Sequence, residues 1–171
     1  MLKDTEKPVR AANRLIRIHG TRDPERLAEE LDITVVPCRF KRQKGVYKVI
    51  ERNRYIFISD SLDPATYAAV LLHEIGHDQL HRGAAVKAGG LKELDIFAMA
   101  DLGMEYEANL FAAQIAVPED ELLEYIAAGY DTESIARMMG ADANLVALKA
   151  SELSRRGYNL RAQTVSCDFL K

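Results

Sequence analysis

The chain has 171 residues, of which 48% are apolar and 29% are charged, so it can form one packed globular domain and is too apolar for general disorder. Its 23 Lys and Arg against 26 Asp and Glu give a net charge of −3, which does not favour a nucleic-acid binder. No apolar run approaches the roughly 20 residues that a membrane span needs, and the first ten residues lack the apolar core of a signal peptide. We therefore expect a cytoplasmic protein that does not bind membranes.

The first 60 residues predict two short helices followed by a small sheet. Apolar side chains recur at helical spacing over residues 9–19, and the pattern stops at Gly20, a common residue after a helix. Asp23 before Pro24 is typical of a helix start. Three β-branched segments follow, ITVVPCRF, GVYKVI and RYIFIS, separated by the turn-like KRQKG and ERNR. Because consecutive strands with short connections usually pair with each other, we expect an antiparallel three-stranded meander.

Positive charge gathers around the second of these strands. Residues 1–58 hold 14 Lys and Arg against 8 Asp and Glu, whereas residues 59–171 hold 9 against 18. The segment before this strand carries the basic side chains Arg39, Lys41, Arg42 and Lys44. We interpret it as a solvated hairpin, with docking of an acidic partner or nucleic acid as the alternative.

A helix that begins after the Asp-Pro pair at residues 63 and 64 contains three of the chain's four histidines. Its segment ATYAAVLLHEIGHDQLH is apolar on nearly all sides, which is typical of a central, covered helix. His73 and His77 are four residues and about 40° apart on a helix, so both imidazoles can bind one metal ion. Glu74 lies about 100° from His73, too far to be a ligand but near enough to act as a general base. This HExxH pattern predicts a catalytic zinc site.

A catalytic zinc needs a third protein ligand and an open position for water. The segment MEYEANLFAAQIAVPED offers one, because its apolar spacing predicts a second buried helix. We prefer Glu105 as the ligand, with Asn109 one turn further on, hydrogen-bonding a ligating histidine and fixing its tautomer. Glu107, on the apolar side, is the competing ligand. His81 is a weaker candidate, because two helical turns separate it from His73 by roughly 12 Å, and we expect it at the rim of the cleft.

These motifs resemble the ImmA/IrrE family of zinc metallopeptidases. The resemblance covers about residues 9–128 and rests on the order of the helix pair, the meander ending in YIFISDSL, then LLHEIGHDQLH and EYEANLFAAQIAVP. It implies a minimal zincin-like α+β domain in which the meander packs on the central HExxH helix, with one zinc ion per chain. It also implies a substrate among the helix-turn-helix repressors, which members of this cytoplasmic family cleave.

Individual residues match the motifs of this family. His73 and His77 match the zinc histidines, Glu74 the catalytic glutamate and Glu105 the third ligand, while Asn109 occupies the final polar position of the E-x-x-A-N pattern. The ending AQIAVP has smaller apolar residues than the family's usual Leu-Leu-Met-Pro, a departure that concerns local packing and not the chemistry.

The chemistry that follows is hydrolysis of a peptide bond by water, with zinc as Lewis acid and Glu74 as general base. The oxyanion that forms needs a hydrogen-bond donor, for which His81, Tyr106 and Arg82 are the candidates. We also expect the strand RYIFIS to be an edge strand that pairs with an extended substrate segment.

Residues 129–171 form, in our interpretation, an accessory helical region packed on the metallopeptidase domain of residues 1–128. The segment DTESIARMMGADANLVALKASELSRRGY has the spacing of a helix-turn-helix. However, residues 131–160 carry four acidic and four basic side chains, a poor balance for binding DNA. We therefore expect a protein substrate and no direct nucleic-acid binding.

The sequence thus predicts a zinc endopeptidase that acts on a regulatory protein. One alternative is a non-catalytic, partner-binding protein with a structural or vestigial zinc site, which would tolerate replacement of Glu74 by Gln. Another is a different zinc hydrolase, such as a peptide deformylase with Cys38 as a ligand, although VVPCRF lacks the expected context. Cys38 and Cys167 lack CxxC spacing and do not indicate a disulfide framework.

Overall fold

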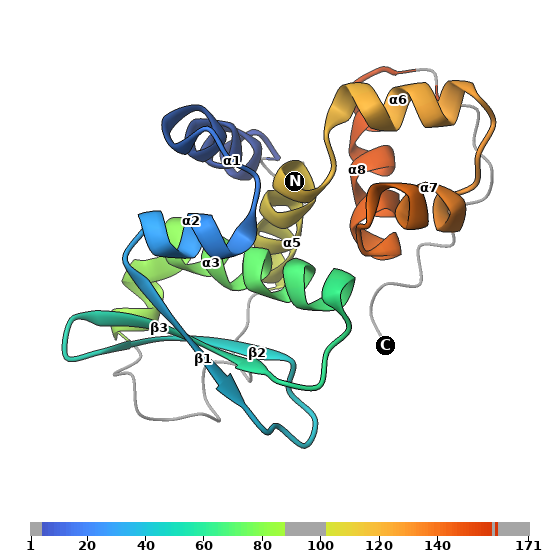
Figure 1. The fold of residues 1–171 in the computed structure, drawn as a ribbon. Helices are drawn as coiled ribbons and strands as arrows, with labels where there is room; N and C mark the ends of the chain where they lie inside the picture. Colours follow the sequence, from blue (N-terminus) through green and yellow to red (C-terminus); the bar gives the residue numbers. More distant parts are fainter. Residues whose placement is uncertain (1–4, 88–101, 159, 161–171) are drawn as a thin grey trace.

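The computed structural model describes residues 5–87, 102–158 and 160. It has the α+β class that the sequence predicts, with helices stacked above a three-stranded sheet in the view of Figure 1. No helix in these residues is both long and apolar enough to cross a bilayer. In chain order the elements are α1 (Glu6–His19), α2 (Pro24–Glu30), β1 (Ile33–Cys38), β2 (Gly45–Ile50), β3 (Asn53–Ser59), α3 (Pro64–Lys87), α5 (Leu102–Ala116), α6 (Glu119–Ala127), α7 (Thr132–Met139) and α8 (Ala143–Arg155).

Local hydrogen bonds explain where the predicted helices begin and end. Gly20 adopts a φ of 64°, and its N–H donates to the Ile16 carbonyl at 2.8 Å, which closes α1 at the predicted residue. Asp63 accepts hydrogen bonds from the N–H groups of Ala65 and Thr66 at 3.1 and 3.0 Å. These are donors that the first turn of a helix cannot satisfy internally, so Asp63 starts the long helix α3.

The sheet differs from the expected antiparallel meander in the position of its last strand. β3 lies between the other two: it runs parallel to β1, with Val35 opposite Ile56, and antiparallel to β2, with Tyr47 opposite Ile56. The meander was therefore the wrong topology, because a strand pattern does not specify which strand lies next to which. Ile56 and Ile58 of β3 are fully buried, which agrees with the central position of this strand. Residues 39–44 connect β1 to β2 across the position of β3.

The same arrangement corrects the expectation that RYIFIS is an edge strand. β3 uses both of its edges for pairing, and β1 and β2 form the two edges of the sheet in the described residues. β2 also packs against α3. The strand edge beside the HExxH helix is therefore that of β2.

The central position of α3 is confirmed. It packs on β2 and β3 on one side and on α5 on the other, and α1 covers α5 (Figure 1). Leu72 and Ile75 of α3 and Phe111 of α5 are at most 1% exposed. Each such side chain contributes about 1.5–3 kcal/mol by leaving water. Polar groups embedded in this layer need partners to offset the cost of their burial.

Helices α6, α7 and α8 lie together beside α5 (Figure 1), with α8 packed on α5 and α7 on α8. Gly140, at a φ of 61°, ends α7 where the helix-turn-helix spacing predicts a turn. Lys149 of α8 is 1% exposed and donates to Gln114 of α5 and, at 3.2 Å, to Glu119 of α6. The buried ammonium group thus ties three helices together, while a domain division at residue 128 stays a prediction.

Candidate metal centre

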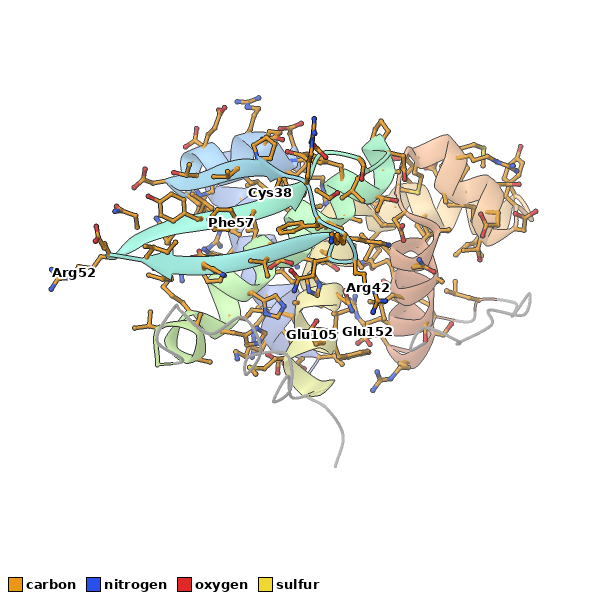
Figure 2. All side chains as sticks on the ribbon, turned by 90° about the horizontal axis from the view of Figure 1, so that it is seen from below. Cys38, Arg42, Arg52, Phe57, Glu105 and Glu152 are labelled. Atoms are coloured by element: carbon orange, nitrogen blue, oxygen red, sulfur yellow. The ribbon has the colours of Figure 1, made fainter. Side chains whose placement is uncertain are left out.

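Helices α3 and α5 bring three ligand-type side chains together. His73 and His77 lie one turn apart on α3, with 3.0 Å between their Nε2 atoms. Glu105 approaches from α5, and its Oε2 and Oε1 atoms lie 3.3 Å from Nε2 of His73 and His77, respectively. The ligand atoms of the three residues all lie within 4.8 Å of one another. The structure therefore assembles the trio that the sequence singled out; Glu105 is labelled in Figure 2.

The donor atoms of this cluster fit a zinc ion. Two imidazole nitrogens and one carboxylate suit Zn²⁺ and leave a fourth tetrahedral position for water. The side chains of His73, His77 and Glu105 are 20%, 18% and 32% exposed, so the cluster is recessed but open to solvent. A structural site normally has four protein ligands, whereas the described residues supply three to this cluster, the number typical of a catalytic site.

Asn109 fixes the orientation of His73. Its Oδ1 atom lies 2.8 Å from Nδ1 of His73, on the side of the ring away from Glu105. Since an amide oxygen can only accept, Nδ1 carries a proton, so in the neutral ring the lone pair is at Nε2, which faces the cluster. This is the contact expected of Asn109.

Glu107 and His81 lie behind His77 rather than among the ligand-type atoms. Nδ1 of His81 is 3.1 Å from Nδ1 of His77, and Nε2 of His81 is 3.2 Å from Oε2 of Glu107. The same Glu107 oxygen pairs with Nζ of Lys7, on α1, at 3.4 Å. Among the described residues, the group that could hold a metal contains Glu105 and neither Glu107 nor His81.

Glu74 is buried beside the cluster, in the position that the sequence predicts for a general base. It is 7% exposed, and this burial raises the pKa of its carboxyl group, although His73 and His77 lower it in part. The backbone N–H of Tyr47, on β2, hydrogen-bonds the carboxylate. Gly45, two residues earlier, leaves room for it, because a Cβ atom at 45 would lie 3.1 Å from Oε1 of Glu74. The edge strand β2 thus forms one wall of the site.

The charges of the cluster favour a cation. Hydrogen bonds from His73 and His77 hold the pKa of Glu105 well below its usual range. Burial opposes protonation of His73, but the hydrogen bond to Glu105 and the charges of Glu74 and Glu105 outweigh it and raise the pKa of the ring. Two carboxylates therefore stabilise positive charge at the point where the Nε2 atoms meet.

Comparison with known proteins agrees with this geometry. Residues 28–151 match the model of a peptidase family described as the IrrE N-terminal-like domain. The chain belongs to this family. The matched residues include both the HExxH helix and α5, so the resemblance seen in the motifs is confirmed.

Two similar proteins extend this comparison of the IrrE-like chain. An uncharacterized immunity region protein 2 of Bacillus phage phi105 is 35% identical over 140 residues, which are 81% of this chain and 86% of the phage protein. A solved structure, a Mycobacterium tuberculosis transcriptional regulator, superposes with a TM-score of 0.60 at 18% identity and covers 85% of this chain. Only 47% of that regulator is covered, so the chain spans about half its length and shares its fold.

Sequence reasoning missed Asp78, which follows the second histidine of this IrrE-like motif. Its side chain is fully buried and accepts hydrogen bonds from the Tyr47 hydroxyl at 2.7 Å and from Arg82 at 2.8 Å. Arg54 on β3 adds a longer contact at 3.4 Å. A carboxylate in an almost wholly apolar helix was the available signal, since burial requires such partners. Asp78 thus links the HExxH helix α3 to β2 and β3.

The three candidate oxyanion donors have other contacts. Arg82 binds Asp78 through two of its nitrogens. His81 lies behind the second histidine of the cluster. The Tyr106 hydroxyl accepts a hydrogen bond from Arg155 at 3.0 Å. An oxyanion role stays a prediction for each of them.

The basic loop before β2 is exposed. Arg39 lies 3.7 Å from Asp60, and the side chains of Lys41, Arg42 and Lys44 are exposed as well. Figure 2 labels Arg42 in this loop. The loop leads directly into the wall of the site at β2, and its use in docking a partner stays a prediction.

The thiol alternative finds no support at the cluster. Cys38, at the end of β1, is a free, half-buried thiol and is not among the residues that could hold a metal in the described part of the chain. Cys167 lies outside the described residues.

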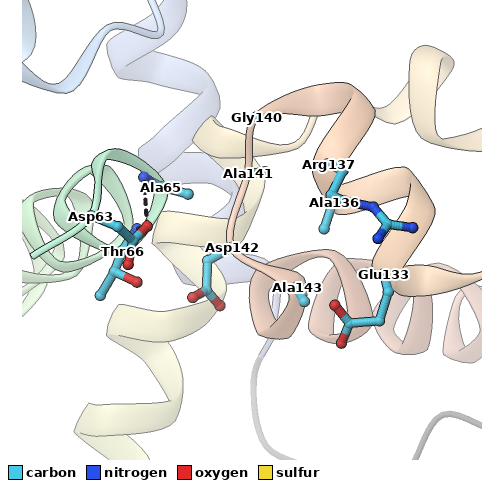
Figure 3. A pocket seen from close by; sticks show the side chains of 10 residues that line it. All are labelled: Asp63, Ala65, Thr66, Glu133, Ala136, Arg137, Gly140, Ala141, Asp142 and Ala143. Atoms are coloured by element: carbon cyan, nitrogen blue, oxygen red, sulfur yellow. Dashed lines mark hydrogen bonds between the residues drawn. The ribbon is translucent and has the colours of Figure 1, made fainter.

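A separate hollow of about 280 Å³ lies between the start of α3 and the α7–α8 turn (Figure 3) and contains none of the predicted site residues.

Proposed function

We propose that the protein is a zinc-dependent endopeptidase. The observation that carries this proposal is the meeting of His73, His77 and Glu105 beside the buried Glu74, in a chain of a peptidase family. A zinc ion held by these three residues would acidify water and polarise a peptide carbonyl group.

Glu74 is the proton carrier of the reaction. Its buried carboxyl group has a raised pKa, which makes the carboxylate a stronger base than an exposed glutamate. It takes a proton from the attacking water and returns it to the leaving amine, so that a single group acts as base and then as acid. The N–H of Tyr47 orients the carboxylate through its hydrogen bond.

The edge of β2 is the surface on which we expect an extended substrate segment to pair. The Ser59 N–H donates to the Lys44 carbonyl at 2.8 Å, so in the alternating antiparallel ladder the backbone groups of Gly45 and Tyr47 point away from β3. The Tyr47 N–H is bound to Glu74, which leaves the groups of Gly45 and the Tyr47 carbonyl for a peptide. A peptide added at this edge would run past Glu74, which approaches Gly45 closely.

The proposed substrate is a regulatory protein. More specifically, we propose a helix-turn-helix repressor in the cytoplasm. The phage relative is named for an immunity region, and the solved neighbour is a transcriptional regulator. The balanced charge of residues 131–160 supports a protein target rather than DNA.

The test is cleavage of a repressor encoded beside the gene, followed by intact-protein mass spectrometry. Parent protein with about one zinc per chain is compared with Glu74→Gln, which keeps all three ligand side chains. We expect one defined cut with the parent and none with Glu74→Gln at equal zinc content. The same pair of proteins is also compared in cells for loss of repression. If Glu74→Gln still relieves repression, the protein is a non-catalytic regulator and the peptidase proposal is wrong.

A further inference from the structure

His77 has a polar neighbour on each side of its ring. Its Nε2 atom faces Glu105 at 3.3 Å, and its Nδ1 atom faces Nδ1 of His81 at 3.1 Å. His81 in turn places Nε2 at 3.2 Å from Glu107, on α5. The side chain of His81 is only 9% exposed, so its hydrogen bonds are with protein groups rather than with bulk water. The contacts form a chain from the cluster to α5.

We propose that His81, held by Glu107, is a positioning residue that sets the tautomer and the orientation of His77 for metal binding. This inference rests on the proposed zinc site and assigns to it two residues that are not ligands.

For a neutral His81, the donors and acceptors of these hydrogen bonds allow one arrangement. Glu107, as a carboxylate, only accepts, so Nε2 of His81 donates to it. A neutral His81 then has a lone pair at Nδ1 and accepts the proton of Nδ1 of His77. With its proton at Nδ1, His77 keeps the Nε2 lone pair free for a metal ion. Glu107 thus sets the tautomer of His81, and His81 sets the tautomer of His77.

The arrangement is the counterpart of the Asn109 contact at the other histidine. Asn109 accepts from Nδ1 of His73 at 2.8 Å, so the neutral form of that ring has its lone pair at Nε2. In their neutral forms both histidines therefore have the same tautomer, and the acceptor at Nδ1 is an amide for His73 and an imidazole for His77. The partners of metal-bound histidines typically affect metal affinity by about 10–100-fold.

Lys7 pairs with Glu107, the last residue in this series of hydrogen bonds. Its ammonium group lies 3.4 Å from the same Glu107 oxygen that faces His81, and it comes from α1. Because the Lys7 side chain is 51% exposed, we expect it to contribute little to metal affinity. The positioning role belongs to His81 and Glu107.

Two replacements of His81 separate positioning from a simple link between α3 and α5. In His81→Asn, the amide oxygen takes the place of Nδ1 and can still accept from His77, while the contact with Glu107 is lost. In His81→Gln, the amide nitrogen takes the place of Nε2 and can still donate to Glu107, while the acceptor for His77 is lost. A structural link would be preserved by Gln; the proposed positioning would be preserved by Asn.

The experiment measures zinc affinity of the full chain by competition with a chelator. We expect His81→Gln to weaken zinc binding by about 10–100-fold and His81→Asn to stay close to the parent. Glu107→Leu should weaken binding more than Glu107→Gln, which keeps an acceptor for His81. His19→Asn, which removes a histidine on α1 that pairs with Glu30, is the matched control.

A second readout follows the Nδ1 proton of His77 in the zinc-loaded protein by NMR. Its exchange with water should be slow in the parent and in His81→Asn and fast in His81→Gln, with the Nδ1 proton of His73 as the internal control. Equal affinities, or the reverse order of Asn and Gln, overturn the positioning role while the zinc site stands. A parent that binds no zinc overturns the proposed function, and the inference with it.

Discussion

Gly76 of α3 lies against Ala108 of α5 so closely that a Cβ atom at 76 would be 3.2 Å from both the Cα and the carbonyl oxygen of Ala108. Both helices carry metal-type ligands, so this contact sets the distance between the histidines and Glu105. In Gly76→Ala, the backbone of Ala108 cannot move aside as a flexible side chain would, and the helices must separate. We expect a loss of about 1–3 kcal/mol of stability from overpacking and zinc binding weakened at least about tenfold.

Gly83→Ala is the matched control, because nothing lies within 4 Å of a Cβ atom at that position of the same helix. There the better helix propensity of alanine should raise stability by about 0.5–1 kcal/mol. Urea unfolding and chelator competition measure both effects. A Gly76→Ala protein that matches Gly83→Ala in both would show that the close contact does not set the geometry.

The identity of the third ligand can be tested by elemental analysis. We expect about one zinc per chain in the parent and in Glu107→Ala, and almost none in Glu105→Ala, because in the described part of the chain Glu105 is the carboxylate grouped with both histidines. Glu107→Ala should bind zinc more weakly but still fill at excess metal. Loss of zinc from Glu107→Ala, with zinc retained in Glu105→Ala, would exchange the roles of the two residues.

The choice between Glu105 and Glu107 shows what the sequence could predict and what it could not. HExxH is a pattern within one helix, where a fixed rotation of about 100° per residue places the side chains, so the relative positions of His73, Glu74 and His77 could be predicted directly. The third ligand depends on how α5 is rotated against α3. That rotation follows from the packing of Gly76 on Ala108, a contact between distant residues that periodicity does not contain.

The place of β1 in the sheet could not be predicted, for the same kind of reason. β2 and β3 are joined by Glu51 and Arg52, both at positive φ, 50° and 69°. The turn-like ERNR predicted this antiparallel hairpin, although a turn of this kind usually contains Gly or Asn. The parallel pairing of β1 with β3 depends on the course of residues 39–44, for which the chain carries no local signal.

Asn109 offers a test of the contact that orients His73. Asn109→Leu leaves Nδ1 of His73 without its acceptor, and we expect zinc affinity to fall by about 10–100-fold. Asn109→Asp retains an oxygen at the same place and should bind zinc nearly as well as the parent. The comparison uses chelator competition, with circular dichroism to check folding. Similar losses in both variants would mean that the amide is needed for something other than accepting this proton.

Asp78 is predicted to matter for stability rather than for chemistry. Asp78→Asn replaces an acceptor that binds Tyr47 and Arg82 and leaves a buried, less well-matched amide. Breaking a buried pair of this kind costs about 3–5 kcal/mol. Arg82→Ala, whose side chain is 47% exposed, should cost much less. Urea unfolding of the zinc-free proteins measures both losses of stability. Equal losses in Asp78→Asn and Arg82→Ala would contradict the larger cost expected for the buried Asp78.

Gly45→Ala is predicted to separate catalysis from metal binding. A Cβ atom at 45 would lie 2.5 Å from Cγ1 of Val70 and 3.1 Å from Oε1 of Glu74. The added methyl group should displace Glu74, the proposed general base, and close part of the β2 edge, while the cluster on α3 and α5 is not touched. We expect the rate of repressor cleavage to fall with zinc content unchanged. In Gly45→Ala with Val70→Ala, the clash with Val70 is removed, so stability should recover but cleavage should not. If stability and cleavage both recover, the clash with Val70 caused both losses, and displacement of Glu74 did not.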